Sequence, residues 1–326
     1  MKVLITGASG FLGSHIAEQF AAAGHETRLL LRRTSSREFL TFPHEEAIGD
    51  VTDPGSLRPA VEGVEAVVHP AGLIKARSEA EFRAVNEQGT SNLLKAIEER
   101  APDLRRFVYI SSMSAHGPSP GGEPRPTEAE PKPVSAYGRS KLGGETATRA
   151  SALADRSVIF RMPVIYGPRD PALLPFFKAV RLRIAPLLWG GRNRLSIIYA
   201  SDAASAVVAA TTADTDAGGR TYCPEDGIVY AWRDLLTAIE SASGRQALMV
   251  PIPLIGYQAA GLGSELFGRI TGQAQVFDRD KVREMRRRAW VCSSTELRED
   301  LGWRPGVQIE EGARLTHEWY REAGWL

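Results

Sequence analysis

The sequence predicts an α/β protein with a doubly wound parallel sheet and a smaller, discontinuous C-terminal part. Two observations predict this fold class. Strand-like and helix-like segments alternate over about the first 165 residues, the pattern of strands whose connecting helices cover both faces of a sheet. In addition, glycines at positions 7, 10 and 13 stand between the first strand-like run and the first helical pattern.

The composition is that of a globular protein with a full-sized core. The chain has 326 residues, of which 43% are hydrophobic and 24% are charged, enough for one large domain or two smaller ones. Forty basic and 39 acidic residues leave a net charge of +1, so we expect neither nucleic acid nor a membrane as partner. The two cysteines, Cys223 and Cys292, predict free thiols with no disulfide and no metal site.

No segment has the pattern of a targeting peptide or of a membrane span. The most apolar later stretch, residues 248–262, contains Pro251 and Pro253. It is also shorter than the run of about 20 apolar residues that a bilayer requires. We therefore expect a cytoplasmic protein.

The first three elements form a βαβ unit. Residues 2–6 predict a strand, residues 11–23 carry apolar side chains at helical spacing, and residues 26–31 predict a second buried strand. The crossover in such a unit is right-handed, and the two strands are parallel.

The three glycines of TGASGFLG have separate physical roles in a unit of this kind. One allows a tight turn, one lets the backbone approach a pyrophosphate, and one allows the helix to pack closely. The alternative is a glycine-rich turn that binds nothing. We predict a Rossmann-type dinucleotide site, whose first residues are Gly7, Gly10, Phe11, Leu12 and Gly13.

Further strands and helices follow in alternation. The segment 117–135 is rich in proline and glycine and predicts a loop, and a loop of this length is usually functional or disordered. The expected elements are a strand and turn at 65–72, a helix at 84–100, a strand at 105–112, a helix at 140–153 and a strand at 157–163.

Directly after this loop, Tyr137 and Lys141 stand four residues apart. On a helix, this spacing places the phenol and the ammonium on one face. A phenol with a pKa of about 10 exchanges protons poorly at neutral pH. A nearby ammonium and the positive ring of an oxidised nicotinamide both favour the phenolate, so we expect a lowered pKa for Tyr137. The alternative is an ordinary exposed pair, because such spacings also arise by chance.

Four motifs together resemble the extended branch of the short-chain dehydrogenase/reductase superfamily, the NAD-dependent epimerase/dehydratase family. They are TGASGFLG, VYISSMSAHG, YGRSK and RMPVIYGP, in the typical order, and the resemblance extends to the closing LREDLGWRP. It implies catalytic roles for Tyr137, Lys141 and Ser112, with Ser111 as the less favoured serine. Asn86 in AVNEQGT matches a fourth polar position, for which a structural role is an equal alternative.

The resemblance implies hydride transfer between a nicotinamide and a hydroxyl or keto carbon of the substrate. Tyr137 would pass the proton to or from the substrate oxygen, and Ser112 would hold that oxygen by a hydrogen bond. Lys141 would bind the nicotinamide ribose and lower the pKa of Tyr137.

The end of the second predicted strand bears on the choice of cofactor. NAD enzymes place an acidic residue there for the ribose 2′-hydroxyl, whereas an arginine accommodates a 2′-phosphate. Here Leu31 holds the acidic position, and Arg32 and Arg33 follow it. We expect NADP(H), with NAD(H) possible. Two solvated arginines at a strand end are the alternative.

The resemblance also implies other cofactor contacts. Asp50 and Val51 match the pair that contacts the adenine, Ala71 and Gly72 match a cofactor turn, and Pro163 is a further contact.

Two positions speak against a nucleotide-sugar substrate. Val164 replaces an Asn near the sugar diphosphate, and Leu195 replaces a phosphate-binding Arg, while the adjacent Arg194 would face the other way on a strand. RMPVIYGP and DKVREMRRRAWVCSS look more like the branch of 3β-hydroxysteroid dehydrogenases and dihydroflavonol reductases. We expect a small apolar substrate, with a nucleotide-sugar epimerase or dehydratase as the alternative and a non-catalytic NADP-binding redox sensor or subunit as the second.

Two features of the C-terminal part have plain structural interpretations. The basic run 279–288 predicts a solvated helix face, with no nucleic-acid role. Six apolar residues suit either an apolar substrate or a domain core. They are Leu173, Leu174, Phe176, Phe177, Leu187 and Trp189.

We expect the dinucleotide-binding domain at 1–165 and about 195–215, where residues 197–210 return to the sheet as strand and helix. The substrate-binding domain is expected at about 166–194 and 222–326. The family resemblance further implies a homodimer formed through helices that include the YGRSK helix.

Overall fold

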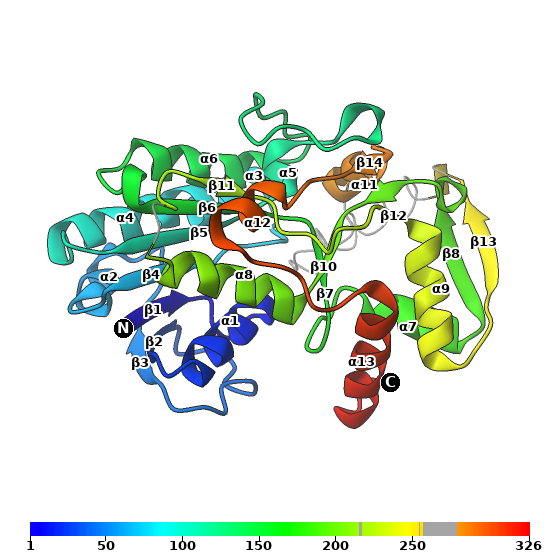
Figure 1. The fold of residues 1–326 in the computed structure, drawn as a ribbon, viewed down its shortest axis with the longest axis horizontal. Helices are drawn as coiled ribbons and strands as arrows, with labels where there is room; N and C mark the ends of the chain where they lie inside the picture. The colour runs from blue at the N-terminus through cyan, green and yellow to red at the C-terminus, as the bar shows by residue number, and fades with distance from the viewer. Residues whose placement is uncertain (215–216, 254, 257–278) are drawn as a thin grey trace.

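Seven parallel strands form the central sheet, in the order β11-β6-β5-β4-β1-β2-β3 (Figure 1). The computed structural model describes residues 1–214, 217–253, 255–256 and 279–326. The strand order reverses between β1 and β4, and this confirms the predicted Rossmann-like, doubly wound α/β fold. The strands are β1 (Lys2–Thr6), β2 (Glu26–Leu31), β3 (Glu45–Ile48), β4 (Ala66–His69), β5 (Arg106–Ser112), β6 (Ser157–Met162) and β11 (Thr221–Tyr222).

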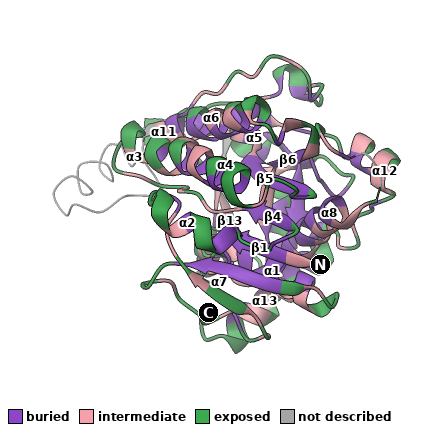
Figure 2. Ribbon diagram, turned by 90° about the vertical axis from the view of Figure 1, so that its left-hand side faces the viewer, coloured by how far each residue is buried: buried purple, intermediate pink, exposed green. Residues whose placement is uncertain are grey.

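Helices cover both faces of this sheet, so its strands are buried on both sides (Figure 2). Alternate side chains of β1 enter opposite cores: Val3 and Ile5 pack on one face and Leu4 on the other. The first core takes side chains from α1 (Phe11–Ala22) and α8 (Ala200–Thr212). The second takes them from α2 (Pro54–Val61), α4 (Gly89–Arg100) and α6 (Ala136–Ala150).

The helix expected at 140–153 begins earlier in the structure, at Ala136. The Ser135 hydroxyl accepts a hydrogen bond from the Gly138 amide at 3.0 Å, which caps the helix and places Tyr137 in its first turn. The expected loop at 117–135 is confirmed apart from one short 3-10 turn, η2 (Pro120–Gly122).

The helix expected at 84–100 begins with a π-helical segment, η1 (Ala84–Gln88), which continues as α4. A short helix, α3 (Glu79–Arg83), precedes it, and α5 (Met113–His116) follows β5.

Residues 197–210 were expected to return to the central sheet as a strand and a helix. The strand does not join that sheet. β10 (Ile197–Tyr199) pairs with β7 (Val164–Tyr166) in a separate two-stranded parallel sheet. Pro163 separates β6 from β7 and has no amide donor, so the chain beyond it leaves the central ladder. The seventh strand is instead β11, which pairs with β6.

The C-terminal part has its own core and lies at the right-hand end of Figure 1. No helix within the described ranges is long and apolar enough to cross a membrane, and residues 254 and 257–262 of the apolar stretch lie outside those ranges. The elements of the C-terminal part are α7 (Leu174–Arg181), β8 (Ile184–Leu188), β9 (Arg194–Leu195), β12 (Tyr230–Ala231), α9 (Trp232–Ser243), β13 (Leu248–Ile252), α11 (Arg279–Met285), β14 (Ala289–Trp290), α12 (Thr295–Leu301) and α13 (Ile309–Glu322), with the 3-10 turn η4 (Trp189–Gly191) before β9. Of these, α12 packs against the first core of the central sheet through Leu297. A further 3-10 turn, η3 (Ala154–Arg156), lies between α6 and β6.

The six apolar residues that suited either an apolar substrate or a domain core belong to cores wherever the structure describes them. Leu173 and Phe177 are buried in the C-terminal core, with Leu174 and Phe176 packed against it. Leu187 is buried in a smaller cluster beside α9. The side chain of Trp189 lies outside the described part of the chain. The domain boundaries stay a prediction.

Candidate active site

The predicted site residues come together at the carboxyl edge of the central sheet. In a parallel sheet all strands end at the same edge, so short loops after different strands become neighbours there. Each predicted cofactor loop follows one of these strands. They are Gly7 after β1, Arg32 and Arg33 after β2, Asp50 and Val51 after β3, Ala71 and Gly72 after β4, and Pro163 after β6.

The glycine turn lies between β1 and α1, next to the loop after β4. Gly7 has a φ of +61°, and a Cβ atom there would lie 2.8 Å from the Ala71 backbone nitrogen. A Cβ atom on Gly13 would collide with the Gly7 carbonyl oxygen. At Gly10 a Cβ atom would have only that oxygen nearby, at 3.3 Å. Gly7 and Gly13 are therefore required by the fold, whereas the packing at Gly10 is less tight. Gly10 lies directly before α1, which begins with Phe11 and Leu12.

A buried chain of hydrogen bonds fixes the ends of β1 and β4. The Thr6 hydroxyl contacts His69 Nδ1 at 2.7 Å and accepts from the Ala71 amide at 3.2 Å. His69 Nε2 lies 3.1 Å from the Thr90 hydroxyl. Burial, and then the charge of Lys141, lower the pKa of His69 to about 3, so it is neutral. We did not predict these hydrogen bonds from the sequence. The one feature of the sequence that points to them is a histidine within an apolar strand.

Asn86 is fully buried in the π-helical segment and holds the loop after β4 against α6. Its Oδ1 accepts from the Leu73 amide at 2.7 Å. Its Nδ2 donates to the Leu73 carbonyl at 3.0 Å and to the Ser140 hydroxyl at 2.9 Å. All of its donors bond within the protein, so this geometry favours the structural alternative.

Tyr137, Lys141 and Ser112 lie close together where α6 meets the end of β5. Ser112 is hydrogen-bonded to Tyr137. Lys141 is buried, and its Nζ lies 4.4 Å above the centre of the Tyr109 ring. A Cβ atom on Gly72 would lie 3.6 Å from the same Nζ. The lysine ammonium therefore faces the loop after β4, and the glycine turn lies beside that loop.

The expected lowering of the Tyr137 pKa is wrong for this structure. Burial, with the smallest contribution from Glu284, raises the pKa of Tyr137 to about 12, against the opposing effect of Ser112. Burial also lowers the pKa of Lys141 to about 7. Loss of hydration disfavours the charged form of both side chains, so burial favours the neutral phenol of Tyr137 and the neutral amine of Lys141.

Ser111 faces away from Tyr137. Its hydroxyl donates to Glu145 Oε1 at 2.6 Å, and Glu145 forms a buried ion pair with Arg161 at 2.8 Å. Ser112 points to the opposite side and accepts from the Ser114 amide at 3.1 Å, which caps α5. The opposite directions of the two side chains favour Ser112 over Ser111 as the site serine, in agreement with the preference from the sequence.

We expected the basic run 279–288 to form a simple solvated helix face. This is wrong for two carboxylates of α11, which contact the start of α6. Asp280 accepts a hydrogen bond from the Ala136 amide, the first of α6. Glu284 is buried and accepts from the Ser135 hydroxyl at 2.7 Å and from Lys281 Nζ at 3.0 Å. Burial alone would raise the pKa of Glu284, but Lys281 and the Ser135 hydroxyl hold it below its usual range. A helix from the C-terminal part thus contacts the start of the YGRSK helix.

Replacing Glu284 by glutamine is expected to lower the pKa of Tyr137, because the carboxylate raises it. The rate of alcohol oxidation rises with pH as Tyr137 ionises, so its rise should move to lower pH. The rate of ketone reduction falls through the same pKa, and that fall should also move to lower pH. Profiles of kcat/KM against pH in both directions test this, with Glu26→Gln, an exposed charge change on β2, as control. Profiles that coincide with the wild type would contradict it.

The two arginines after β2 are exposed, and the Leu31 side chain before them is fully buried in the core. Arg32 and Arg33 form no ion pair with any residue that the structure describes. Asp50 accepts from the Thr52 amide and hydroxyl, both at 2.8 Å, so its loop is ordered by its own side chain.

Both cysteines are buried free thiols, as expected. They lie in one small cluster with Met113, the residue after Ser112. The Cys223 thiol and burial raise the pKa of Cys292 well above its ordinary value. Across the described ranges no group of histidine, cysteine, aspartate or glutamate side chains could hold a metal ion.

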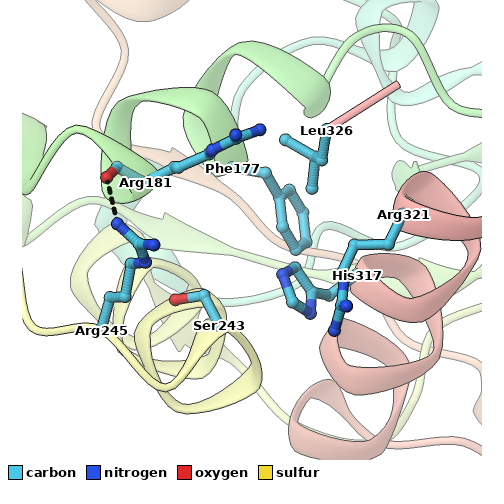
Figure 3. A pocket seen from close by; sticks show the side chains of 7 residues that line it. All are labelled: Phe177, Arg181, Ser243, Arg245, His317, Arg321 and Leu326. Atoms are coloured by element: carbon cyan, nitrogen blue, oxygen red, sulfur yellow. Dashed lines mark hydrogen bonds between the residues drawn. The ribbon is translucent and has the colours of Figure 1, made fainter. Parts of the chain in front are cut away.

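A cavity of about 300 Å³ lies away from this edge, in the C-terminal part (Figure 3). It opens between α7, α9 and α13, and Phe177 stacks against His317 in its wall, with the ring centres 6.2 Å apart. None of the predicted site residues lines it. Its lining residues are Phe177, Arg181, Ser243, Arg245, His317, Arg321 and Leu326.

A parallel sheet with a glycine turn at its first crossover is the arrangement of a dinucleotide-binding enzyme. A model of the NAD dependent epimerase/dehydratase family matches residues 3–223. The chain belongs to this family and is an enzyme of its NAD(P)-dependent oxidoreductase and epimerase kind.

The chain is similar over nearly its whole length to proteins of several activities. It is 33% identical to a ceramide reductase of Caulobacter vibrioides, covering 99% of this chain and 96% of that one. It is 28% identical to a 2-alkyl-3-oxoalkanoate reductase of Stenotrophomonas maltophilia, covering 96% and 98%. The structure of a Thermus thermophilus UDP-glucose 4-epimerase in complex with NAD superimposes with a TM-score of 0.78, at 24% identity and 99% and 100% coverage.

Proposed function

We propose that the protein is an NAD(P)H-dependent reductase that acts on a ketone of a substrate with a long apolar chain. The observation that carries this proposal is the placement of Ser112, Tyr137 and Lys141 beside the glycine turn. The relatives that support the substrate class are named as reductases of a ceramide and of a 2-alkyl-3-oxoalkanoate. Both named substrates contain alkyl chains and a carbon that bears oxygen.

The residues around the expected diphosphate position also support an apolar substrate. Leu195 stands where a phosphate-binding arginine is expected, and it is buried in the C-terminal core. Arg194 is exposed on the other side of β9 and bonds to Glu123 at 3.2 Å. A phosphate at this position would therefore meet leucine rather than a cation.

A reduced nicotinamide held at this edge of the sheet would supply a hydride to the carbonyl carbon. Ser112 holds the carbonyl oxygen by a hydrogen bond, and Tyr137 donates its phenolic proton to that oxygen, so the C=O bond becomes CH–OH. Its pKa of about 12 keeps Tyr137 protonated at neutral pH, which suits proton donation. Lys141 faces the loop after β4, where it can bind the nicotinamide ribose.

Assays of the purified protein with different substrates test the proposal. A long-chain 3-oxo lipid in detergent should be reduced with consumption of NADPH, faster than a short-chain 3-oxo ester. Interconversion of UDP-glucose and UDP-galactose without net change in the nicotinamide would contradict the proposal and indicate the epimerase alternative. Cofactor binding without turnover of any ketone would indicate the sensor alternative.

We further propose that NADPH is preferred to NADH through Arg32 and Arg33. A charge-assisted contact with the 2′-phosphate contributes about 1.5–3 kcal/mol, roughly ten- to a hundredfold in affinity. Replacing both arginines by alanine should weaken NADPH selectively and leave NADH unchanged, and the wild-type preference should shrink as salt rises. Fluorescence titrations with both nucleotides measure this. Equal affinities of the wild type at low salt would contradict it.

Homodimerisation and a cytoplasmic location remain predictions. Sedimentation analysis of the purified protein tests the first, and fractionation of the source cells tests the second.

A further inference from the structure

The outer face of the two-stranded β8–β13 sheet is unusually apolar for an exposed surface. Leu182, Ile184, Leu248 and Val250 are 74%, 50%, 72% and 36% exposed. With Ile255, they make up five of the nine exposed large apolar side chains among the described residues. Such a concentration marks an interaction surface, whereas apolar side chains scattered singly do not.

The pairing register places the strand residues on one surface. Leu248 is paired with Ile184, and Val250 with Pro186, so these four side chains lie on the same side of the sheet. Leu182 is exposed in the segment that leads into β8, two residues before Ile184. The alternate residue Ala185 points inward and is buried against Leu236 of α9. In Figure 1 both strands lie at the right-hand end of the molecule, at its surface.

Three exposed arginines border this surface at the ends where both strands begin. Arg181 and Arg183 precede β8, and Arg245 precedes β13. Arg245 Nη1 donates to the Arg181 carbonyl at 3.0 Å, and the Leu248 amide donates to the Arg183 carbonyl at 2.9 Å, so the two segments lie side by side. None of the three arginines forms an ion pair within the ranges that the structure describes.

The cavity of about 300 Å³ lies at the same end and adds further positive charge (Figure 3). Arg181 and Arg245 line it together with Arg321 and the His317 ring of α13. The three arginines come from three helices or their ends and surround one opening, whereas burial, and then the charge of Arg321, lower the pKa of His317 and favour its neutral ring. A hollow of this size and charge can admit a phosphate group.

We propose that the β8–β13 face, defined by Leu182, Ile184, Leu248 and Val250 with Arg181, Arg183 and Arg245 at its end, docks the protein on an anionic lipid bilayer. The apolar side chains would enter the boundary between headgroups and acyl chains, and the arginines would contact lipid phosphates. This inference rests on the proposed function in that a long-chain lipid ketone has to be taken from a membrane.

Charge complementarity favours a bilayer over a second copy of the chain. A symmetric dimer would cover the apolar side chains, but it would bring no carboxylate to the three arginines, because the face as defined contains none, whereas an anionic bilayer supplies phosphates. The net charge of +1 does not reveal this surface, because it averages local charge over the whole chain. The proposal therefore departs from the expectation of no membrane partner, which was based on the net charge.

Flotation with lipid vesicles tests the inference without any measurement of turnover. The probes are vesicles of pure phosphatidylcholine and of phosphatidylcholine mixed with phosphatidylglycerol, and the protein is the full-length wild type. We expect binding to the anionic vesicles, weakened by salt, and at least tenfold weaker binding to the neutral ones. Leu182→Ser/Leu248→Ser and Arg181→Gln/Arg183→Gln should each lose at least tenfold in binding to the anionic vesicles.

Matched controls distinguish binding through this surface from nonspecific hydrophobic or electrostatic binding. Ile228→Ser/Val229→Ser removes two exposed apolar side chains elsewhere, and Arg58→Gln/Arg100→Gln removes two exposed charges; both should bind as the wild type does. Thermal melting confirms that all variants fold. Equal vesicle binding of the wild type and the face variants, or no binding by the wild type, overturns the inference. So does a wild-type dimer that Leu182→Ser/Leu248→Ser dissociates while vesicle binding is absent.

The two proposals fail separately. Vesicle binding without ketone reduction leaves the docking surface standing and removes the proposed substrate class. Reduction of a detergent-solubilised lipid ketone without vesicle binding leaves the reductase standing and removes the docking surface.

Discussion

Replacing Tyr137 by phenylalanine is expected to reduce turnover by about 100- to 10,000-fold, the usual contribution of a positioned proton donor. The change removes only the phenolic oxygen that Ser112 contacts. The ring still packs against Phe82, with the ring centres 5.9 Å apart, so the start of α6 should keep its position. The affinity for the nicotinamide cofactor should therefore change little.

Single-turnover reduction and fluorescence titration of the nicotinamide measure these two effects separately. Tyr222→Phe is the matched control, because it removes a phenolic hydroxyl that bonds to Asp300 at 2.8 Å on another strand. A Tyr137→Phe variant that keeps most of its turnover would remove Tyr137 from the reaction.

Substitutions at two glycines of the same turn are expected to have opposite effects. Gly10→Val should lose cofactor binding and keep the fold, because Gly10 has an extended backbone conformation that valine adopts and its Cβ would meet only the Gly7 carbonyl oxygen, at 3.3 Å. Gly13→Val should unfold the protein or destabilise it by about 1–3 kcal/mol or more, since its Cβ would collide with the Gly7 carbonyl.

Thermal melting and nicotinamide titration of both variants distinguish a ligand site from a structural turn. Gly10→Val with wild-type affinity would show that the glycine motif only shapes the turn. Gly13→Val with a wild-type melting temperature would contradict the packing argument for that position.

The sequence predicted the central sheet well because its signals are local. Apolar runs and helical spacing give β1, α1 and β2 nearly to the residue. The parallel arrangement then places the residues after each strand at one edge. Local signals located β10 but not the sheet that it joins. They missed β3 and β11, which have four and two residues, too few for a clear periodicity.

The parts of the site that the sequence missed depend on distant contacts and on burial. Glu284 lies in a basic run whose pattern shows charge but not its partner Ser135. His69 and Thr90 bond to each other through packing that no spacing rule contains. The raised pKa of Tyr137 comes mainly from loss of solvent, and the spacing to Lys141 carries no information about burial.

The contact between α11 and α6 has a consequence for the order of folding. Asp280 is 144 positions from Ala136, and Glu284 is 149 positions from Ser135. Closing so long a loop is entropically costly, and contacts between distant residues form late, whereas β1, β2 and β4 pair within the first third of the chain. We therefore expect a refolding chain to acquire its sheet and its nucleotide turn before the start of the YGRSK helix receives its last partners. Secondary structure should then return before competence for catalysis.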